Sequence, residues 1–291
     1  MAGIIRMGGA MSTAGTGSRQ AAAGPAATKE PIMRFEAALI TGATSGIGEA
    51  IARVLPATTA LWLTGRDVSR LAALAAELGK ADRPVATFAA DLAKRGEQDA
   101  MIAWAAAAPI DLLVNNAGFG RFGPALEGGE RDRAMIEVNL LASMALAQAL
   151  LPGMLERARS TGRRAGLINV ASVVGFFPWP YFAAYAASKA FLVSWTAALA
   201  AELRDDPVDV LALCPGATTT KFHERAGYAG VPGWGSHSPD RVAREALEAI
   251  GRRPVHVVGV TNRIAVAAIR YLPRWLTMRG TARATARNDR R

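Results

Sequence analysis

The chain has 291 residues, 51% of them apolar, and a formal net charge of +10. This length suits one α/β domain of roughly 250 residues with a sizeable buried core. The single cysteine, Cys214, excludes an intramolecular disulfide and suits a reducing compartment, so we expect a cytoplasmic protein.

The positive charge gathers at the two ends of the chain. Residues 1–34 carry a net charge of +3 and residues 279–291 carry +4, which leaves only +3 for residues 35–278. This distribution argues against nucleic-acid binding and predicts a flexible N-terminal tail and a basic C-terminal tail. Gly, Ser and Thr interrupt residues 7–18, so no secretory leader is expected, and no run reaches the roughly 18 uninterrupted apolar residues of a membrane span.

From residue 35 onward, short apolar runs alternate with longer helical segments. Strands are predicted at 37–40, 61–64, 85–89, 112–114, 167–170 and 210–213, with a seventh at 255–258. Helices are predicted near 47–55, 68–79, 97–107, 131–158, 183–204 and 239–250. This alternation indicates one α/β domain over residues 35–258, a Rossmann-type doubly wound parallel sheet of about seven strands in a three-layer α/β/α arrangement.

A glycine-rich turn from Thr41 to Gly48 (TGATSGIG) follows the first predicted strand and opens a helix. Its glycines allow a tight turn and close approach to a pyrophosphate, and the helix N-terminus offers free N–H groups. This placement favours binding of a dinucleotide over a plain turn. Contacts with the cofactor are expected from Gly42, Ser45, Gly46, Ile47 and Gly48.

The second predicted strand ends near Gly65 and Arg66, where NAD-binding folds usually place an acidic residue for the adenosine ribose. Gly65 lacks that carboxylate, and the Arg66 guanidinium can bind a 2′-phosphate. Asp67 lies further into the turn, and the alternative for Arg66 is a solvated loop residue. The sequence therefore favours NADP(H) over NAD(H).

Tyr185 and Lys189 lie four residues apart in a predicted helix, on one helix face. An ordinary tyrosine has a pKa of about 10, and a nearby ammonium favours the phenolate and lowers that pKa. Ser172 follows the strand at 167–170, at the sheet edge where open α/β folds bind ligands, and its hydroxyl can hold a substrate oxygen. Asn139 lies inside a predicted helix, where asparagine has low propensity, and could hold a water in a proton relay.

Together these residues resemble the short-chain dehydrogenase/reductase (SDR) family in its single-domain form. The resemblance covers roughly residues 35–258, and the offset of 13 residues from Ser172 to Tyr185 is the usual one. The matching elements, in the family's order, are residues 41–48, Asp91-Leu92, residues 115–118, Asn139, Ser172, Tyr185, Lys189 and Pro215-Gly216.

The resemblance implies a role for each matching residue. Tyr185 would be the acid/base, Lys189 would lower its pKa and hold the nicotinamide ribose, and Ser172 would orient the substrate. Asn139 would support the proton relay. The other cofactor contacts would be Asp91 and Leu92 at the adenine, Asn115 near the adenosine ribose with Ala117 and Gly118 after it, Pro215, Gly216 and Thr218 along the nicotinamide, and Thr220 at its carboxamide or the phosphates. A homo-oligomer formed through the two long helices is also implied.

Several other residues have side chains that could take part in chemistry or in substrate binding. Cys214 is expected to be a buried, inert cysteine, and no metal is predicted because the three histidines lack ligand spacing. These histidines are His223, His237 and His256. An aromatic run precedes Tyr185, and it favours an apolar substrate pocket over ordinary packing or an oligomer contact. The run comprises Phe176, Phe177, Trp179 and Tyr181.

The segment over residues 259–278 is predicted to be amphipathic, with a break or kink at Pro273. Its arginines on one side of the wheel are Arg263, Arg270 and Arg274, and its apolar residues on another are Ile264, Ala268, Tyr271 and Trp275. Either a terminal helix covering the domain or its partner, or a segment lying on a membrane surface, fits this pattern.

The hypothesis that follows is reversible hydride transfer between NADP(H) and a small-molecule carbonyl or secondary alcohol. The apolar side chains expected around the pocket suggest a lipid-like or aromatic ketone. A non-catalytic NADP-binding or scaffold protein is the alternative from another class. An epimerase or dehydratase on the same fold is the alternative among enzymes.

Overall fold

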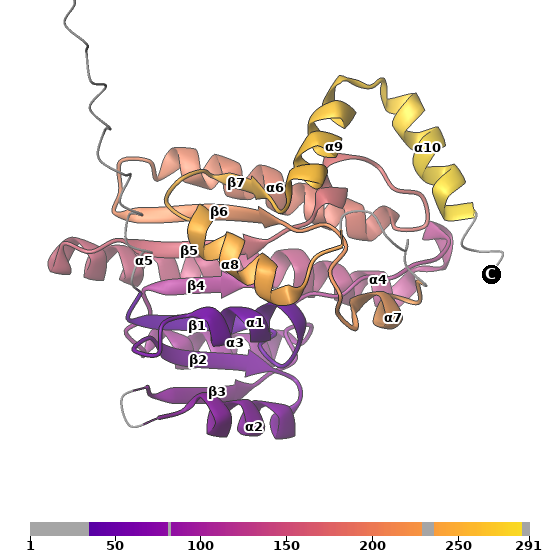
Figure 1. The fold of residues 1–291 in the computed structure, drawn as a ribbon. Helices are drawn as coiled ribbons and strands as arrows, with labels where there is room; N and C mark the ends of the chain where they lie inside the picture. Colours follow the sequence, from indigo (N-terminus) through magenta and orange to yellow (C-terminus); the bar gives the residue numbers. More distant parts are fainter. Residues whose placement is uncertain (1–34, 81–82, 229–235, 287–291) are drawn as a thin grey trace, which may run out of the picture. The chain divides into compact units, whose positions relative to one another are not determined.

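The computed structural model describes residues 35–80, 83–228 and 236–286, so the predicted tail at residues 1–34 lies outside the described residues. In this part of the chain, seven parallel strands form one sheet in the order β3-β2-β1-β4-β5-β6-β7 (Figure 1). The strands are β1 (Ala37–Thr41), β2 (Ala60–Gly65), β3 (Val85–Ala89), β4 (Leu112–Asn115), β5 (Ala165–Val170), β6 (Val208–Cys214) and β7 (Val255–Val257). All seven predicted strands are confirmed, and each of their ends lies within two residues of the predicted one.

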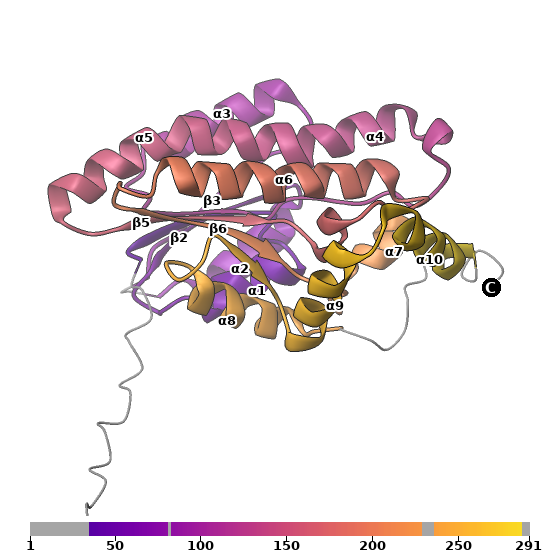
Figure 2. The same cartoon turned by 90° about the horizontal axis from the view of Figure 1, so that it is seen from above.

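Helices cover both faces of the sheet, as Figure 2 shows from above. One face carries α1 (Gly46–Val54), α2 (Val68–Leu78) and α8 (Pro239–Ala249). The other face carries α3 (Arg95–Ala106), α5 (Ser143–Thr161) and α6 (Ala183–Glu202). The shorter elements are η1 (Ala125–Glu127), α4 (Gly129–Ile136), the π-helical η2 (Glu137–Ala142), η3 (Val173–Phe176) and α7 (Phe222–Ala226). The predicted three-layer arrangement is confirmed.

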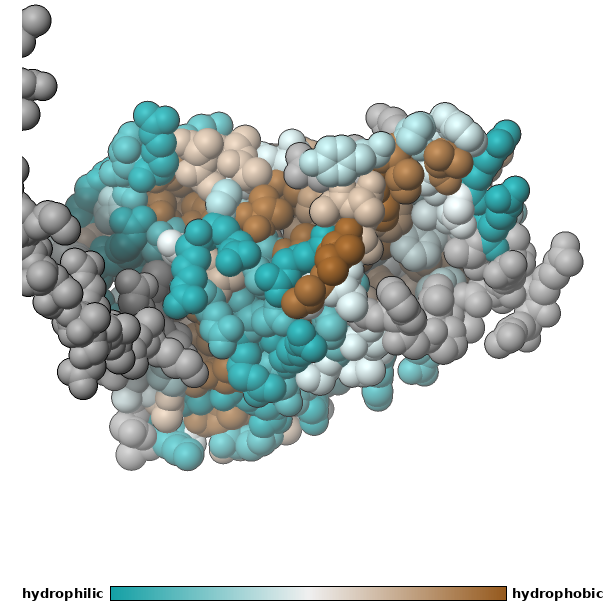
Figure 3. All heavy atoms as spheres, turned by 45° about the horizontal axis from the view of Figure 1, so that its top comes forward, coloured by the Kyte–Doolittle hydropathy of each residue, from teal (hydrophilic) through white to brown (hydrophobic). Residues whose placement is uncertain are grey.

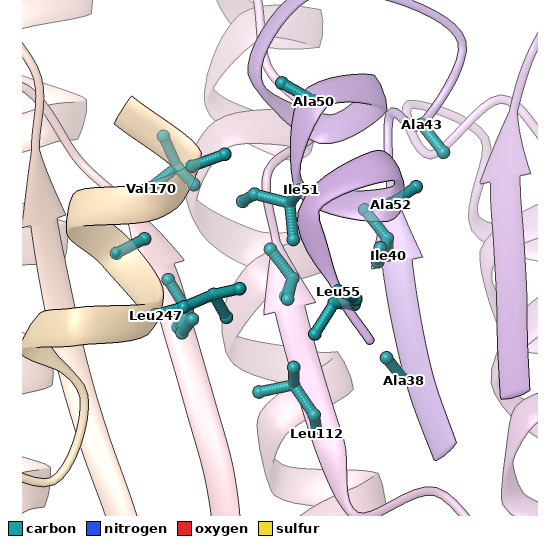
Figure 4. Close-up of a cluster of buried hydrophobic side chains, with 14 of the residues drawn as sticks. Ala38, Ile40, Ala43, Ala50, Ile51, Ala52, Leu55, Leu112, Val170 and Leu247 are labelled. Carbon is teal, nitrogen blue, oxygen red and sulfur yellow. The ribbon is translucent and has the colours of Figure 1, made fainter. Parts of the chain in front are cut away.

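The strands are continuous apolar runs because both of their faces are buried. In β1, Ala38 and Ile40 pack toward α1 and α8, whereas Leu39 packs into the core under α3 and α5. Figure 4 shows Ile51 and Leu55 of α1 meeting the sheet beside Ile40. This two-sided core fixes where each strand ends, and therefore where the loops after the strands begin.

The strand order reverses between β1 and β4, because β1 pairs with β2 on one side and with β4 on the other. The loops that follow β1 and β4 therefore leave the sheet in different directions and open a crevice at its carboxyl edge. In open α/β sheets, this reversal is where ligands bind.

Among the described residues, one helical stretch, Gly129–Thr161, is long and apolar enough to cross a membrane by length and composition alone. Half of its apolar window is buried inside the fold, where η2 and α5 pack on the sheet. A core helix of this kind passes the same test, so the stretch is weak support for a membrane span. Its π-helical part, η2, contains Asn139.

The chain ends in two helices, α9 (Val260–Tyr271) and α10 (Arg274–Ala286), and the break between them falls at Pro273 as predicted. Helix α10 runs to residue 286, so it includes part of the predicted basic tail. One of the two alternatives for residues 259–278 needs correction. The predicted apolar side of α9 does not cover the domain, since Ile264 and Tyr271 are exposed, and Val266 is the buried residue.

Candidate active site

A cleft of about 610 Å³ lies at the carboxyl edge of the sheet, within the range typical of ligand pockets. It collects most of the residues predicted from the sequence. Those that line it are Gly42, Ser45, Gly46, Ile47, Arg66, Asp91, Leu92, Ala117, Gly118, Ser172, Tyr185, Lys189, Pro215, Gly216, Thr218 and Thr220. Residues that follow each of the strands β1 to β6, together with Tyr185 and Lys189 of α6, thus form one site.

The turn after β1 is held in place by β4. Thr41 Oγ1 accepts hydrogen bonds from the N–H groups of Asn116 (3.0 Å) and Ala117 (2.9 Å). The Asn116 carboxamide donates in return to the carbonyl oxygen of Thr41 at 2.9 Å. Gly42 and Gly46 have φ angles of 65° and 63°, a conformation that favours glycine. The result is a preformed cradle at the N-terminus of α1, where an anion is stabilised.

Gly48 does not line the cleft, but it sets how closely α1 approaches the turn. A Cβ atom at this position would lie 2.6 Å from the carbonyl oxygen of Gly42 and would overlap the Asn116 carboxamide. Gly48 therefore has a packing role, and its predicted contact with a cofactor stays a prediction. Arg225 of α7 donates to the Ser45 hydroxyl at 3.3 Å and brings a positive charge to the same loop.

Strand β2 ends at Gly65 and is followed by Arg66, as the sequence indicates. A Cβ atom on Gly65 would lie 2.8 Å from Cγ2 of Thr44, so this position is closed to larger residues unless Thr44 shifts. Arg66 is exposed, lines the cleft and has no ion pair within the described residues. Asp67 caps α2 by accepting the N–H of Arg70 at 2.9 Å. Its carboxylate is thus already engaged at the start of α2.

Three buried side chains, Ser172, Tyr185 and Lys189, meet on one wall of the cleft. Ser172 caps η3 by accepting the N–H of Val174 at 3.3 Å, which fixes its hydroxyl at the end of β5. Lys189 donates to the carbonyl oxygen of Val170 at 2.8 Å, and its Nζ lies 5.8 Å from the centroid of the Tyr185 ring. One turn of α6 therefore places the amine beneath the aromatic ring.

The expected lowering of the Tyr185 pKa is not found. Burial raises the pKa of Tyr185 above its ordinary value, and a hydrogen bond with Ser172 opposes this only in part. Burial also lowers the pKa of Lys189 to about 8, because the ammonium loses its hydration. Desolvation outweighs the attraction that the four-residue spacing suggests, and the phenol of Tyr185 stays protonated at neutral pH.

Two predicted asparagines lie outside the cleft. Asn115 is buried, and its carboxamide donates to the backbone oxygen of Ser143 and to Asn169 Oδ1 at 2.9 Å each. Its predicted place near the adenosine ribose stays a prediction. Asn139 Oδ1 accepts the N–H of Phe119 at 3.0 Å, and Asn139 Nδ2 donates to the Phe119 oxygen at 2.9 Å. The Asn139 side chain therefore positions the loop after β4, and its predicted part in a proton relay stays a prediction.

The other half of the cleft is aromatic. Phe177 and Trp179 of the predicted run line it, whereas Phe176, the last residue of η3, packs against the core cluster that includes Leu192 and Tyr181 is exposed. Many other residues that line the cleft were not predicted from the sequence, including Phe119, Phe182, Phe222, Tyr228, Asn262, Ile269, Gly280 and Thr281. They come from several separate segments, and no spacing between them gave a signal.

In the described residues, the geometry does not bring Cys214 and the histidines together as a nucleophile with its base or as metal ligands. Cys214 is fully buried, and burial raises the pKa of its thiol to about 12. His223 lines the aromatic half of the cleft, whereas His256 pairs with Glu245 at 2.9 Å. His237 lies 3.4 Å from the Asn262 carboxamide. Within the described ranges, no three His, Cys, Asp or Glu side chains converge as metal ligands would.

Comparison with known proteins agrees with this geometry. Residues 36–228 match the family model of the short chain dehydrogenases. Dehydrogenase/reductase SDR family member 7B of Bos taurus is 32% identical over 244 residues, covering 78% of this chain and 74% of the relative.

Two solved structures are also similar. A short-chain dehydrogenase from Sphingobium yanoikuyae in complex with NADPH is 30% identical, with a TM-score of 0.70, over 80% of this chain and 93% of that one. A 3-ketoacyl-(acyl-carrier-protein) reductase from Brucella melitensis complexed with NADH is 29% identical, with a TM-score of 0.69, over 79% and 98%.

The chain belongs to the short-chain dehydrogenase family and is an oxidoreductase of that family. A pyridine dinucleotide fits the cleft, because the glycine cradle accepts a pyrophosphate and the cleft runs from there to Tyr185. The predicted cytoplasmic location and homo-oligomer stay predictions.

Proposed function

We propose that this protein interconverts an apolar carbonyl compound and its secondary alcohol with NADP(H), and that Tyr185 moves the proton. The observation that carries the proposal is the meeting of Ser172, Tyr185 and Lys189 on the wall that the glycine cradle faces across one cleft. A hydride donor bound in the cradle and a carbonyl beside Tyr185 would share this enclosed space.

When bound, the dinucleotide supplies the hydride to the carbonyl carbon, or accepts it in the oxidation. The Ser172 hydroxyl holds the carbonyl oxygen, and Tyr185 donates its phenolic proton to that oxygen. A raised Tyr185 pKa keeps the proton on the phenol until the oxygen becomes negative. Lys189 then stabilises the phenolate that forms, since its ammonium lies 5.8 Å from the ring centroid.

The preference for NADP(H) rests on Arg66 and Gly65. Arg66 is exposed at the cleft and has no carboxylate partner among the described residues, so its guanidinium is available for a 2′-phosphate. Asp67, the nearest acidic residue, caps α2 instead of facing a ribose. This hydrogen bond holds one oxygen of the Asp67 carboxylate at the start of α2.

Titrations of the purified protein with NADPH and NADH test this preference. NADPH should bind at least about tenfold more tightly in the wild type, and Arg66→Ala should remove most of the difference. Arg252→Ala changes an exposed arginine away from the cleft and should bind like the wild type. Equal affinity of the wild type for both cofactors would refute the preference.

An apolar substrate follows from the rings around the reacting position. Phe222 lies 5.2 Å from the Tyr185 ring and Phe182 lies 5.8 Å from it, centroid to centroid. Phe177, Trp179 and Tyr228 extend this surface along the cleft. Such walls stabilise an alkyl or aryl group in proportion to the apolar area they cover.

A panel of ketones, followed by NADPH absorbance and by mass spectrometry of the product, tests the reaction. We expect one NADPH consumed for each alcohol formed, with higher kcat/KM for bulkier apolar ketones. Product without net consumption of NADPH would indicate an epimerase or dehydratase. Tight NADPH binding with no turnover of any ketone would indicate a non-catalytic protein.

A further inference from the structure

Helix α9 buries one stripe of side chains and exposes another apolar stripe on its opposite side. Asn262, Val266 and Ile269 follow the helical repeat on the inner side, where α9 packs against η3. Val260, Ile264 and Tyr271 follow the same repeat on the outer side, and Tyr271 is 90% exposed. A helix that only covers the domain needs the first stripe and not the second.

Exposed apolar residues are concentrated on these two helices. Eleven large apolar side chains are exposed in the described residues, and seven of them lie between residues 260 and 278. These seven are Val260, Ile264, Tyr271, Leu272, Trp275, Leu276 and Met278, which we call the C-terminal apolar face. A patch of this kind marks an interaction surface.

The same segment is basic. Residues 260–286 contain five arginines and no acidic residue. Arg263, Arg279 and Arg283 are exposed, and the Arg279 guanidinium lies 5.2 Å from the centroid of the Trp275 ring. In Figure 3, apolar residues in brown and hydrophilic residues in teal lie side by side on this part of the surface. Tryptophan, tyrosine and arginine beside exposed aliphatic residues are the composition that an anionic membrane interface attracts.

The helices also form part of the cleft. Ile269 of α9 and Gly280 and Thr281 of α10 line it. Thr281 donates to the carbonyl oxygen of Pro178 at 3.4 Å, which ties α10 to the aromatic loop between η3 and α6. Both helices lie beyond the carboxyl ends of the strands (Figure 1, Figure 2). The C-terminal apolar face is thus the outer side of a wall whose inner side contacts the substrate half of the cleft.

We propose that α9 and α10 dock on an anionic lipid surface and that the apolar substrate enters the cleft from the lipid. Entry of the substrate from the lipid rests on the proposed function, whereas docking of the two helices does not. A two-fold contact between copies through this face would bring the arginines of one copy close to those of the other, and these like charges would repel. An anionic lipid surface would instead attract the arginines.

Co-sedimentation of the full chain with vesicles tests the docking. We expect binding to vesicles of phosphatidylcholine with phosphatidylglycerol, weaker binding to phosphatidylcholine alone, and release by salt. Ile264→Ser with Trp275→Ser should weaken partitioning by roughly tenfold or more. Arg279→Gln with Arg283→Gln should weaken it by roughly fivefold for each charge removed. Val68→Ser, which changes an exposed valine on α2, is the matched control and should bind like the wild type.

Binding of the Ile264→Ser/Trp275→Ser variant at the wild-type level would overturn the docking, as would equal binding to neutral and anionic vesicles. Capture of an acidic protein with no vesicle binding would also contradict it. NADPH oxidation with a water-soluble ketone separates this result from the proposed function, because none of the substituted residues lines the cleft. The variants should retain that activity.

Turnover of a long-chain ketone in the presence of vesicles tests the entry route. The wild type should hold its rate as anionic vesicles take up the ketone, whereas the Ile264→Ser/Trp275→Ser variant should lose rate in proportion to the ketone removed from water. Equal loss of rate in both proteins would contradict entry from the lipid even if docking is observed.

Discussion

Lys189 Nζ lies 5.8 Å from the centroid of the Tyr185 ring and donates a 2.8 Å hydrogen bond to the carbonyl oxygen of Val170. The amine is therefore held by β5 and not by the phenol. Its position allows it to stabilise a phenolate that forms during reaction, although in this structure it does not lower the pKa of the resting phenol. Under the proposed function, the reduction therefore requires the positive charge of Lys189.

The pH dependence of ketone reduction should report that charge. The pKa of Lys189 is lowered to about 8, so the fraction of protein with a charged amine falls as the pH rises through this value. We expect kcat/KM, which reports the free enzyme, to fall by about tenfold for each further pH unit. Lys189→Met should have a low kcat/KM that does not fall further as the pH rises through this value. A wild-type profile that stays level well above this pH would contradict the role of the ammonium.

Gly48 should be intolerant of a side chain, although it does not line the cleft. Gly48→Ala places a methyl group 2.6 Å from the Gly42 carbonyl oxygen and against Asn116, and so displaces the cradle. We expect NADPH binding to weaken by about tenfold or more, measured by fluorescence titration. Gly96→Ala in α3 meets open space and should leave binding unchanged while raising stability by about 0.5 kcal/mol. Unchanged binding in both variants would show that the cradle does not depend on this close approach.

Most of the fold could be predicted from the sequence, because buried parallel strands are short apolar runs with turn residues at their ends. The site could be predicted to the extent that its residues directly follow strands or share a helix face, as Ser172, Tyr185 and Lys189 do. Asn115 and Asn116 show the limit of predicting site residues from their position after a strand. Neighbouring strand residues point to opposite sides, and the sequence alone did not show that Asn116 holds the turn while Asn115 is buried between Ser143 and Asn169.

The pKa of Tyr185 and the inner face of α9 could not be predicted for a related reason. Both depend on burial by segments far away in the sequence. The spacing of Tyr185 and Lys189 gives their proximity but not the desolvation that raises one pKa and lowers the other. The wheel of α9 has two apolar stripes, and only packing selects the one with Val266.

The Cys214 thiol should be unreactive in the folded protein. Its side chain is fully buried and the pKa of its thiol is raised to about 12, so almost no thiolate exists at neutral pH. The folded protein should resist a thiol-specific reagent that labels it rapidly after unfolding. Cys214→Ala should lower stability by about 1 kcal/mol and keep kcat near the wild-type value. Rapid labelling of the native protein, or a large loss of kcat, would show that Cys214 takes part in the chemistry.

The proton transfer by Tyr185 is the central claim, and the turnover of Tyr185→Phe tests it most directly. This change removes one hydroxyl and keeps the ring that packs against Phe182 and Phe222. We expect kcat for ketone reduction to fall by about 10²–10⁴-fold, with the Kd for NADPH changed less than about threefold. Tyr181→Phe, on an exposed ring outside the cleft, is the matched control and should keep full activity. Retention of more than about a tenth of the wild-type kcat by Tyr185→Phe would contradict the account.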